Sequence, residues 1–251
     1  ERDAFALAAA KRLAIIDSEH EGLVFGRLDH TDGEIRYIGR IGVRDDDYEP
    51  LVIDWRARAA EPFYRATAND PMDVVRRRVL RCRNDIVIGI EDDLLDSSAA
   101  RSDLPVIGEG ALMAALKRAR GPKMRDIVAT IQAEQDEAIR AEHSGVTVIA
   151  GGPGTGKTVV ALHRAAYLLY SNRRRFERGG ILVIGPSGLF MNYIERVLPS
   201  LGEDSVMLRA IGQVAVDVLG FSASRQDAAL AATIKGSTRM LKVLKELVVL
   251  P

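Results

Sequence analysis

The sequence predicts an α/β protein in which a small, mostly antiparallel β module precedes a parallel sheet built from β-α-β units. Residues 22–96 contain short alternating apolar runs separated by turn residues, which is typical of antiparallel strands. After residue 110, apolar strands alternate with helices, which indicates crossovers between parallel strands. We therefore expect the end of a helical arm in residues 1–20, the β module in residues 21–108 and the α/β domain in residues 109–251.

The composition indicates a folded chain with no membrane association. The 251 residues are 47% hydrophobic, enough for one large or two small domains, and charges interrupt every apolar run. Lys+Arg and Asp+Glu balance at 35 each, so any basic surface for nucleic acid must be local. The single cysteine, Cys82, suits a reducing cytoplasm. The chain does not begin with Met, and we expect it to be part of a longer protein.

The first half is predicted to contain one helix and several short strands. Residues 1–18 are rich in Ala and lack Gly and Pro, which predicts a helix, either on the surface or as one arm of a helical hairpin or coiled coil. Asp32 and Gly33 lie between two alternating runs and predict a hairpin with a type I′ turn. Further strands are predicted at LVIDW, VVRRRVLRC and IVIGIEDDLL.

The second half is predicted to alternate helices with strands. Helices are expected at ALMAALKRA, at residues 126–143 and at PSGLFMNYIERVLPSLG, and strands at VTVIA and GGILVIG. The terminal LKVLKELVVL fits either a helix or a strand.

A phosphate-binding loop follows the predicted strand VTVIA. Residues 151–158 match G-x-x-x-x-G-K-[ST] in full, and a helix is predicted directly after them. Lys157 is expected to reach the β- and γ-phosphates of ATP, and the Thr158 hydroxyl to bind Mg²⁺, so these two are the catalytic candidates. The expected nucleotide-binding residues are Gly151, Gly152, Pro153, Gly154, Thr155, Gly156, Lys157, Thr158 and Val159.

Two glutamines upstream of the loop are candidates for recognising the base. Gln132 and Gln135 lie about twenty residues before Lys157, and a carboxamide can donate to and accept from an adenine edge. A glutamine on a helix is more often simply solvated, so the pattern alone is weak.

Other charged and aromatic residues favour structural roles. Arg76, Arg77 and Arg78 are interpreted as a solvated strand face rather than a surface for phosphates or an acidic partner. The acids that follow apolar runs, Asp54 and Glu91 to Asp93, precede the loop and are interpreted as structural or surface acids. Trp55 is expected in the core.

The loop and its surroundings resemble the opening of a superfamily 1 helicase motor of the UvrD type. The resemblance covers IQAEQDEAIRAEHSGVTVIAGGPGTGKTVVALHRAAYLL and, at ILVIGPSGLFMNYIERVLPSLGE, the family's motif Ia. It places Gln135 at the adenine-reading Q-motif position and Arg164 at the arginine of the P-loop helix. It also implies that the predicted parallel sheet is RecA-like.

The preceding block resembles the HelD group of UvrD-like proteins, called HelR in some actinobacteria. It is carried by YIGRIGVRDDDYEPLVIDWRARAAEPFYRAT and VVRRRVLRCRNDIVIGIEDDLLD, although Arg58 stands where members often have proline. The resemblance implies an ATP-driven motor that binds bacterial RNA polymerase and releases stalled enzyme from nucleic acid. It also implies that the Walker B acids, arginine fingers and second motor domain lie beyond this chain. We therefore expect an incomplete RecA-like domain that binds ATP with little or no turnover.

Two other functions remain open at this stage. One is a DNA helicase or translocase that unwinds DNA in repair or recombination. The other is a non-catalytic module in which the loop only senses nucleotide.

Overall fold

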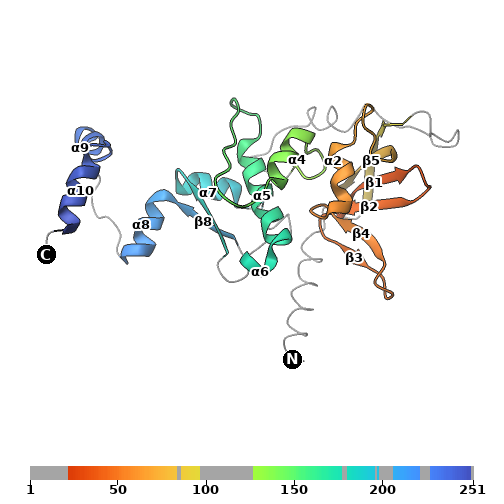
Figure 1. The fold of residues 1–251 in the computed structure, drawn as a ribbon, viewed down its shortest axis with the longest axis horizontal. Helices are drawn as coiled ribbons and strands as arrows, with labels where there is room; N and C mark the ends of the chain where they lie inside the picture. The colour runs from red at the N-terminus through yellow and green to blue at the C-terminus, as the bar shows by residue number, and fades with distance from the viewer. Residues whose placement is uncertain are drawn as a thin grey trace. The chain divides into compact units, whose positions relative to one another are not determined.

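The computed structural model describes residues 22–83, 86–96, 127–176, 180–195, 197, 206–220 and 227–249. The helix expected in residues 1–20 and the helix expected at ALMAALKRA lie outside the described residues. The chain divides into two compact units, Glu1–Arg209 and Ala210–Pro251, and each is described by itself (Figure 1).

A six-stranded mixed sheet dominates the described residues 22–96, which we call the β module. Its neighbours follow the order β3-β4-β2-β1-β5-β6, and all pairs are antiparallel except β2 with β4. The mostly antiparallel sheet predicted from the sequence is therefore confirmed. The strands are β1 (Val24–His30), β2 (Ile35–Gly39), β3 (Val43–Arg44), β4 (Pro50–Asp54), β5 (Val74–Arg83) and β6 (Ile86–Leu94).

The hairpin between β1 and β2 forms where it was predicted, but its turn is of another type. Gly33 alone in the turn has a positive φ, +89°. The Gly33 amide donates to the His30 carbonyl at 3.0 Å, and the His30 amide donates to the Glu34 carbonyl at 2.9 Å. This pattern is a type I turn followed by a glycine bulge, which holds Asp32 in an ordinary conformation. The predicted type I′ turn, which needs positive φ at both residues, is wrong.

A short helical segment covers the core of the β module. It consists of the 3-10 turn η1 (Arg58–Ala60) and helix α2 (Glu61–Arg65). Arg58 begins η1, so the turn forms here without the proline common in the resembling family. Phe63 packs edge to face on Phe25, with centroids 5.6 Å apart, and a Cβ at Gly26 would clash with the same Phe63 ring. Trp55 is fully buried, as predicted.

The three consecutive arginines of β5 do not form a solvated face, and that prediction is wrong. The strand register sets each of them opposite an acid on β1 or β6, and Arg76 is only 2% exposed. Ion pairs across strands replace the solvation that the sequence pattern suggested. The pairs are Arg76 with Asp29, Arg77 with Asp93 and Arg78 with Asp92. The interpretation of the Asp92 and Asp93 carboxylates as structural acids is confirmed.

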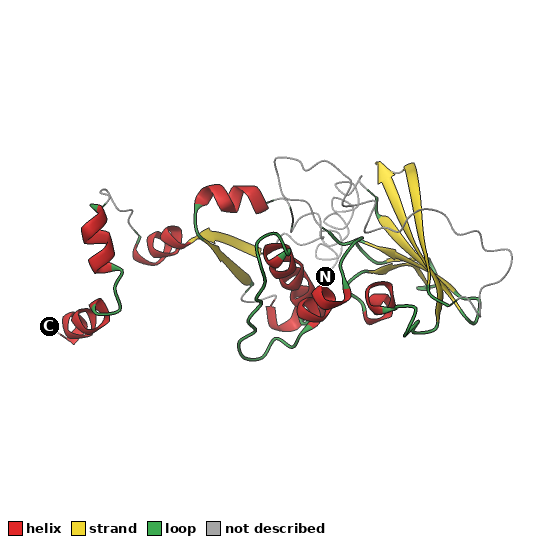
Figure 2. Cartoon of the chain, turned by 90° about the horizontal axis from the view of Figure 1, so that it is seen from above, coloured by secondary structure: helices red, strands yellow, loops and turns green. Residues whose placement is uncertain are grey.

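Four helices and a two-stranded sheet make up the rest of the first unit in the described residues. The helices are α4 (Ala133–Arg140), α5 (Lys157–Ser171), α6 (Arg173–Phe176) and α7 (Gly188–Ile194). Strands β7 (Ile181–Gly185) and β8 (Val206–Ala210) pair with each other. In Figure 2 this strand pair is the smaller of the two groups of yellow arrows, and the sheet of the β module is the larger.

The described residues do not show the predicted RecA-like parallel sheet, because outside the β module they contain a sheet of only two strands. Residues 146–150, the predicted strand VTVIA, form no strand, and Val146 and Val148 are 91% and 83% exposed. β-branched residues favour strands because their side chains pack on a pleated, half-buried surface. The described residues provide no neighbouring strand for this segment, so it does not form a strand. Strand β7 is likewise half exposed rather than buried.

Helix α4 is shorter than the helix predicted for residues 126–143. Thr130 closes a turn on the Ile127 carbonyl at 2.7 Å, and Gln132 is extended as the residue before the helix. Ala141, with φ of −54° and ψ of 148°, leaves the helical conformation after the last turn. The periodic apolar pattern therefore continues through turns that are not helical.

The second unit contains three helices among its described residues. They are α8 (Ile211–Leu219), α9 (Ala229–Lys235) and α10 (Met240–Val249), so residues 241–249 of the terminal LKVLKELVVL segment are helical. In the part of the chain that the structure describes, no helix combines the length and the apolar character needed to cross a membrane.

Candidate nucleotide-binding site

The loop from Gly151 to Gly156 bends sharply and leads directly into helix α5. Gly154 and Gly156 have φ values of +77° and +89°, a region that suits glycine. Gly156 is the residue before the helix, and Lys157 and Thr158 are its first two residues. The unpaired amides of the first turn and the helix dipole together favour an anion at this end.

The Lys157 ammonium lies over the start of the loop. Its Nζ donates to the carbonyls of Gly151 and Gly152 at 2.8 and 2.7 Å. Thr155 Oγ1 donates to the Gly152 carbonyl at 2.9 Å and tightens the same turn. An ammonium group has three N–H donors. The two carbonyls occupy two of them, so the third can donate to an anionic oxygen of a ligand. The loop thus has the curvature and the charge that a polyphosphate needs.

Gln135 is the glutamine that reaches the loop. Its Nε2 donates to the Thr155 carbonyl at 3.4 Å, and the same nitrogen lies 3.0 Å from where a Cβ on Gly156 would be. Its Oε1 accepts from the Gln132 amide at 3.1 Å. The Gln132 side chain instead donates to the Thr130 carbonyl at 3.0 Å. The geometry therefore separates the two candidate glutamines, which the sequence alone could not do.

Arg164 closes the end of α4. Its guanidinium donates to the carbonyls of Ala138 and Ile139, each at 3.2 Å, to that of Ala141, and to that of Glu142 at 2.6 Å. These are carbonyls that the end of a helix leaves without a backbone partner. Burial lowers the pKa of the Arg164 guanidinium from its ordinary value. Arg164 thus ties the helix of the loop to the helix of Gln135.

Comparison with known families gives two matches that follow each other along the chain. Residues 1–104 match the N-terminal domain of DNA helicase IV HelD, and residues 131–248 match the UvrD/REP helicase N-terminal domain. The chain is a HelD-like member of the UvrD helicase superfamily. This confirms the resemblance seen in the sequence. No curated protein matches the chain.

In this HelD-like chain the two matched domains meet around Trp55. Its ring lies edge to face against His163 of α5, with centroids 5.6 Å apart. The Arg56 guanidinium lies over the ring of Tyr170, 4.7 Å from the centroid, and pairs with Asp54 at 2.8 Å. Burial raises the pKa of Tyr170. We call these contacts of the β module with α4 and α5 the junction.

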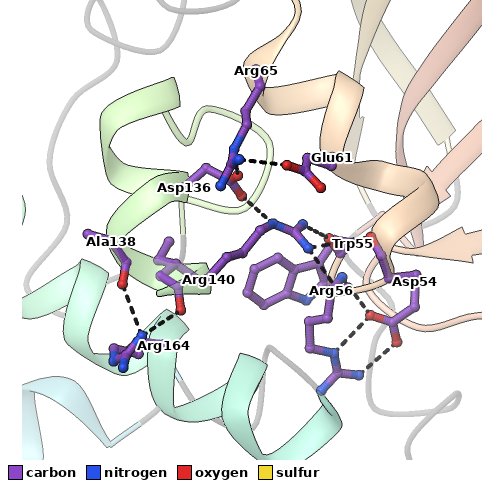
Figure 3. A network of polar contacts seen from close by, with 11 residues as sticks. Asp54, Trp55, Arg56, Glu61, Arg65, Asp136, Ala138, Arg140 and Arg164 are labelled. Carbon is purple, nitrogen blue, oxygen red and sulfur yellow. Dashed lines mark hydrogen bonds and ion pairs between the residues drawn. The ribbon is translucent and has the colours of Figure 1, made fainter. Parts of the chain in front are cut away.

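Arginine side chains complete the junction (Figure 3). Arg140 of α4 donates to the carbonyls of Trp55 and Arg56 at 2.8 and 3.0 Å, and Arg65 of α2 pairs with Asp136 of α4. No local sequence pattern indicated these contacts, because the partners lie 71 to 85 residues apart. The helix that carries Gln135 is therefore held from both sides, by the β module and by α5.

Proposed function

We propose that this HelD-like chain binds ATP with Mg²⁺ and serves an ATP-driven motor that acts on RNA polymerase bound to nucleic acid. The observation that carries the ATP part is the hydrogen bond from Gln135 Nε2 to the Thr155 carbonyl. It brings a carboxamide able to read a base next to a loop able to hold phosphates. The match to the UvrD/REP helicase N-terminal domain supports the same assignment.

Each residue of the site has a separate role in this proposal. The amides of the loop and of the first turn of α5, from Gly151 to Val159, surround the phosphates. Lys157 contacts the β- and γ-phosphates, and the Thr158 hydroxyl is a ligand of Mg²⁺, which neutralises phosphate charge when bound. Gln135 accepts from and donates to the adenine edge.

We expect the chain alone to hydrolyse ATP slowly or not at all. Hydrolysis needs carboxylates that position Mg²⁺ and the attacking water. In the described β module the candidate acids are held by arginines: Asp54 by Arg56, Asp92 by Arg78 and Asp93 by Arg77. We therefore expect these ion-paired carboxylates to stabilise the β module and not to bind Mg²⁺.

The polymerase part rests on the match of residues 1–104 to the HelD N-terminal domain, since a general helicase lacks such a block before its motor. A protein interface combines apolar contacts with a polar rim, so its affinity falls only moderately with salt. Binding to a phosphate backbone falls steeply with salt because counterions are released.

A pull-down of the full-length protein with core RNA polymerase, with and without nuclease and over a salt series, tests this part. We expect association that survives nuclease and weakens gradually with salt. Loss of all association after nuclease would contradict the polymerase proposal.

A DNA helicase is the second candidate, because the matching N-terminal domain is that of DNA helicase IV. This function requires ATPase activity that single-stranded DNA stimulates, together with strand separation. Measuring both with the full-length protein in the absence of polymerase distinguishes the two candidates.

A further inference from the structure

Asp136 is a fully buried carboxylate held by arginines from both matched domains. Its Oδ2 accepts from Arg65 Nε at 2.8 Å, and its Oδ1 accepts from Arg140 Nε at 2.7 Å. Arg65 also pairs with Glu61 of its own helix at 2.6 Å. A buried charge that loses one partner is strongly unfavourable. The contact between α2 and α4 therefore has a defined geometry, unlike an exposed surface pair.

Arg140 extends this contact to the backbone of the β module. Besides binding Asp136, it donates to the Trp55 and Arg56 carbonyls, and it lies 5.3 Å from the centroid of the Tyr167 ring. A guanidinium presents its donors in a rigid plane, so several simultaneous contacts fix its direction. Figure 3 shows Arg65, Asp136 and Arg140 in one continuous chain of contacts that reaches Trp55.

Helix α4 depends on these contacts for its position. It has eight residues, whereas helices shorter than about 12–15 residues are marginal on their own. Gln135 immediately precedes Asp136, so a displacement of Asp136 also moves Gln135 relative to the loop. The hydrogen bond from Gln135 to Thr155 is already long at 3.4 Å, so a small displacement would break it.

We propose that Arg65 and Asp136 are positioning residues for Gln135, so that the HelD-type β module contributes to the choice of nucleotide base. The pair acts through α4 and touches no nucleotide itself. The inference rests on the proposed function in one respect, the contact of Gln135 with the base.

The test compares the nucleotide selectivity of the full-length wild-type protein with that of its Arg65→Ala and Asp136→Asn variants. Arg65→Ala leaves the sequence of the UvrD-type domain unchanged, and Asp136→Asn keeps the shape of the buried side chain. Affinities for ATP, GTP and inorganic triphosphate are measured by competition with a fluorescent ATP analogue. We expect the preference for ATP over GTP to fall about fivefold, the size of one hydrogen bond, with the affinity for triphosphate unchanged.

The ratio of the affinities for ATP and GTP distinguishes a loss of Gln135 positioning from a loss of protein stability. A smaller folded fraction lowers all three apparent affinities equally and leaves the ATP to GTP ratio unchanged. Arg36→Ala is the matched control, because it removes an arginine of the β module that pairs with Glu34 at an exposed site away from α4. Arg65→Lys, which keeps the charge, should restore part of the selectivity and serves as the readout if Arg65→Ala does not fold.

The outcomes separate this inference from the function it rests on. An unchanged ratio in Arg65→Ala and Asp136→Asn, with a lowered ratio in Gln135→Ala, would overturn the positioning role and leave the proposed function standing. An unchanged ratio in Gln135→Ala as well would remove the base contact, and the positioning role with it.

Discussion

Trp55 and His163 meet edge to face, with ring planes inclined at 66° and both side chains fully buried. The His163 ring is fixed by two hydrogen bonds, since Nδ1 lies 2.8 Å from the Val159 carbonyl and Nε2 accepts from the Ile127 amide at 3.3 Å. Trp55 belongs to the β module and His163 to the helix that begins at Lys157. The two rings therefore join the β module directly to the helix of the candidate nucleotide site.

Tryptophan fluorescence should report on this contact, because Trp55 is the only tryptophan of the chain. We expect Mg-ADP to change the emission of Trp55, since a ligand at Lys157 acts on the helix that holds His163. The measurement is a fluorescence titration of the chain. Lys157→Ala should keep the starting spectrum and lose the response, and an equal response in that variant would show that the signal does not come from the loop.

Lys157→Ala should weaken Mg-ATP binding about tenfold to a hundredfold. A hydrogen bond to a charged group contributes about 1.5–3 kcal/mol, and the ammonium already lies at the loop. Titration of a fluorescent ATP analogue measures the change. Lys235→Ala is the control, since Lys235 is an exposed lysine that pairs with Asp227 in the second unit. Equal affinities of wild type and Lys157→Ala would remove the loop from the binding site.

The two glutamines should differ in their effect on base selectivity. We expect Gln135→Ala to reduce the preference for ATP over GTP more than it reduces the affinity for triphosphate. Gln132→Ala should change the preference less than Gln135→Ala, because the Gln132 side chain bonds to the Thr130 carbonyl and the Gln135 backbone amide rather than to the loop. If only Gln132→Ala lowers the preference in binding assays, the assignment to Gln135 is wrong.

Gly26→Ala should destabilise the β module by about 1–3 kcal/mol, the usual cost of overpacking a core. The added methyl would meet the Phe63 ring. Gly188→Ala is the matched control, because nothing lies within 4 Å of the added Cβ at the start of α7. Urea unfolding followed by circular dichroism compares the two. A neutral Gly26→Ala would mean that the Phe63 ring can move aside.

Asp29 should make stability depend on pH in the acid range. Burial raises its pKa, but hydrogen bonds from Arg76 and Arg27 outweigh burial and hold the pKa below the ordinary value of 3.8. A lowered pKa in the folded state gives stabilisation that is complete above 3.8 and lost as the pH falls through the lowered value.

We therefore expect Asp29→Asn to be less stable than wild type near neutral pH, with the difference shrinking below about pH 3.8. Urea unfolding over a pH series measures it. Asp46→Asn, in the exposed loop between β3 and β4, should follow the wild type throughout. A difference for Asp29→Asn that does not change with pH would indicate a loss of packing rather than of an ionised pair.

Local features were predicted well from the sequence, and contacts between distant segments were not. The glycine-rich loop, helix α5 and the strands around Asp32 and Gly33 depend on neighbouring residues, so their patterns were visible. The burial of Arg76 was missed because its acid, Asp29, lies on another strand. The role of Arg140 was missed because the Trp55 carbonyl is 85 residues away along the chain.

The predicted strand at residues 146–150 failed for a related reason. Its composition suits a strand, but a strand also needs a neighbour with which to exchange hydrogen bonds. Such a neighbour is a property of the assembled sheet, and outside the β module the described residues provide only the pair β7 and β8.

The hydrogen bond that Gln135 Oε1 accepts from the Gln132 amide has a consequence for the entropy of ligand binding. A carbonyl oxygen has two lone pairs, so this bond can persist while a base donates to the same oxygen. A glutamine side chain that is ordered only on binding loses rotamer freedom, about 0.5–1.5 kcal/mol for a flexible side chain. Here the start of helix α4 has already ordered the carboxamide. A base that binds to Gln135 therefore meets a group whose rotamers are fixed in advance.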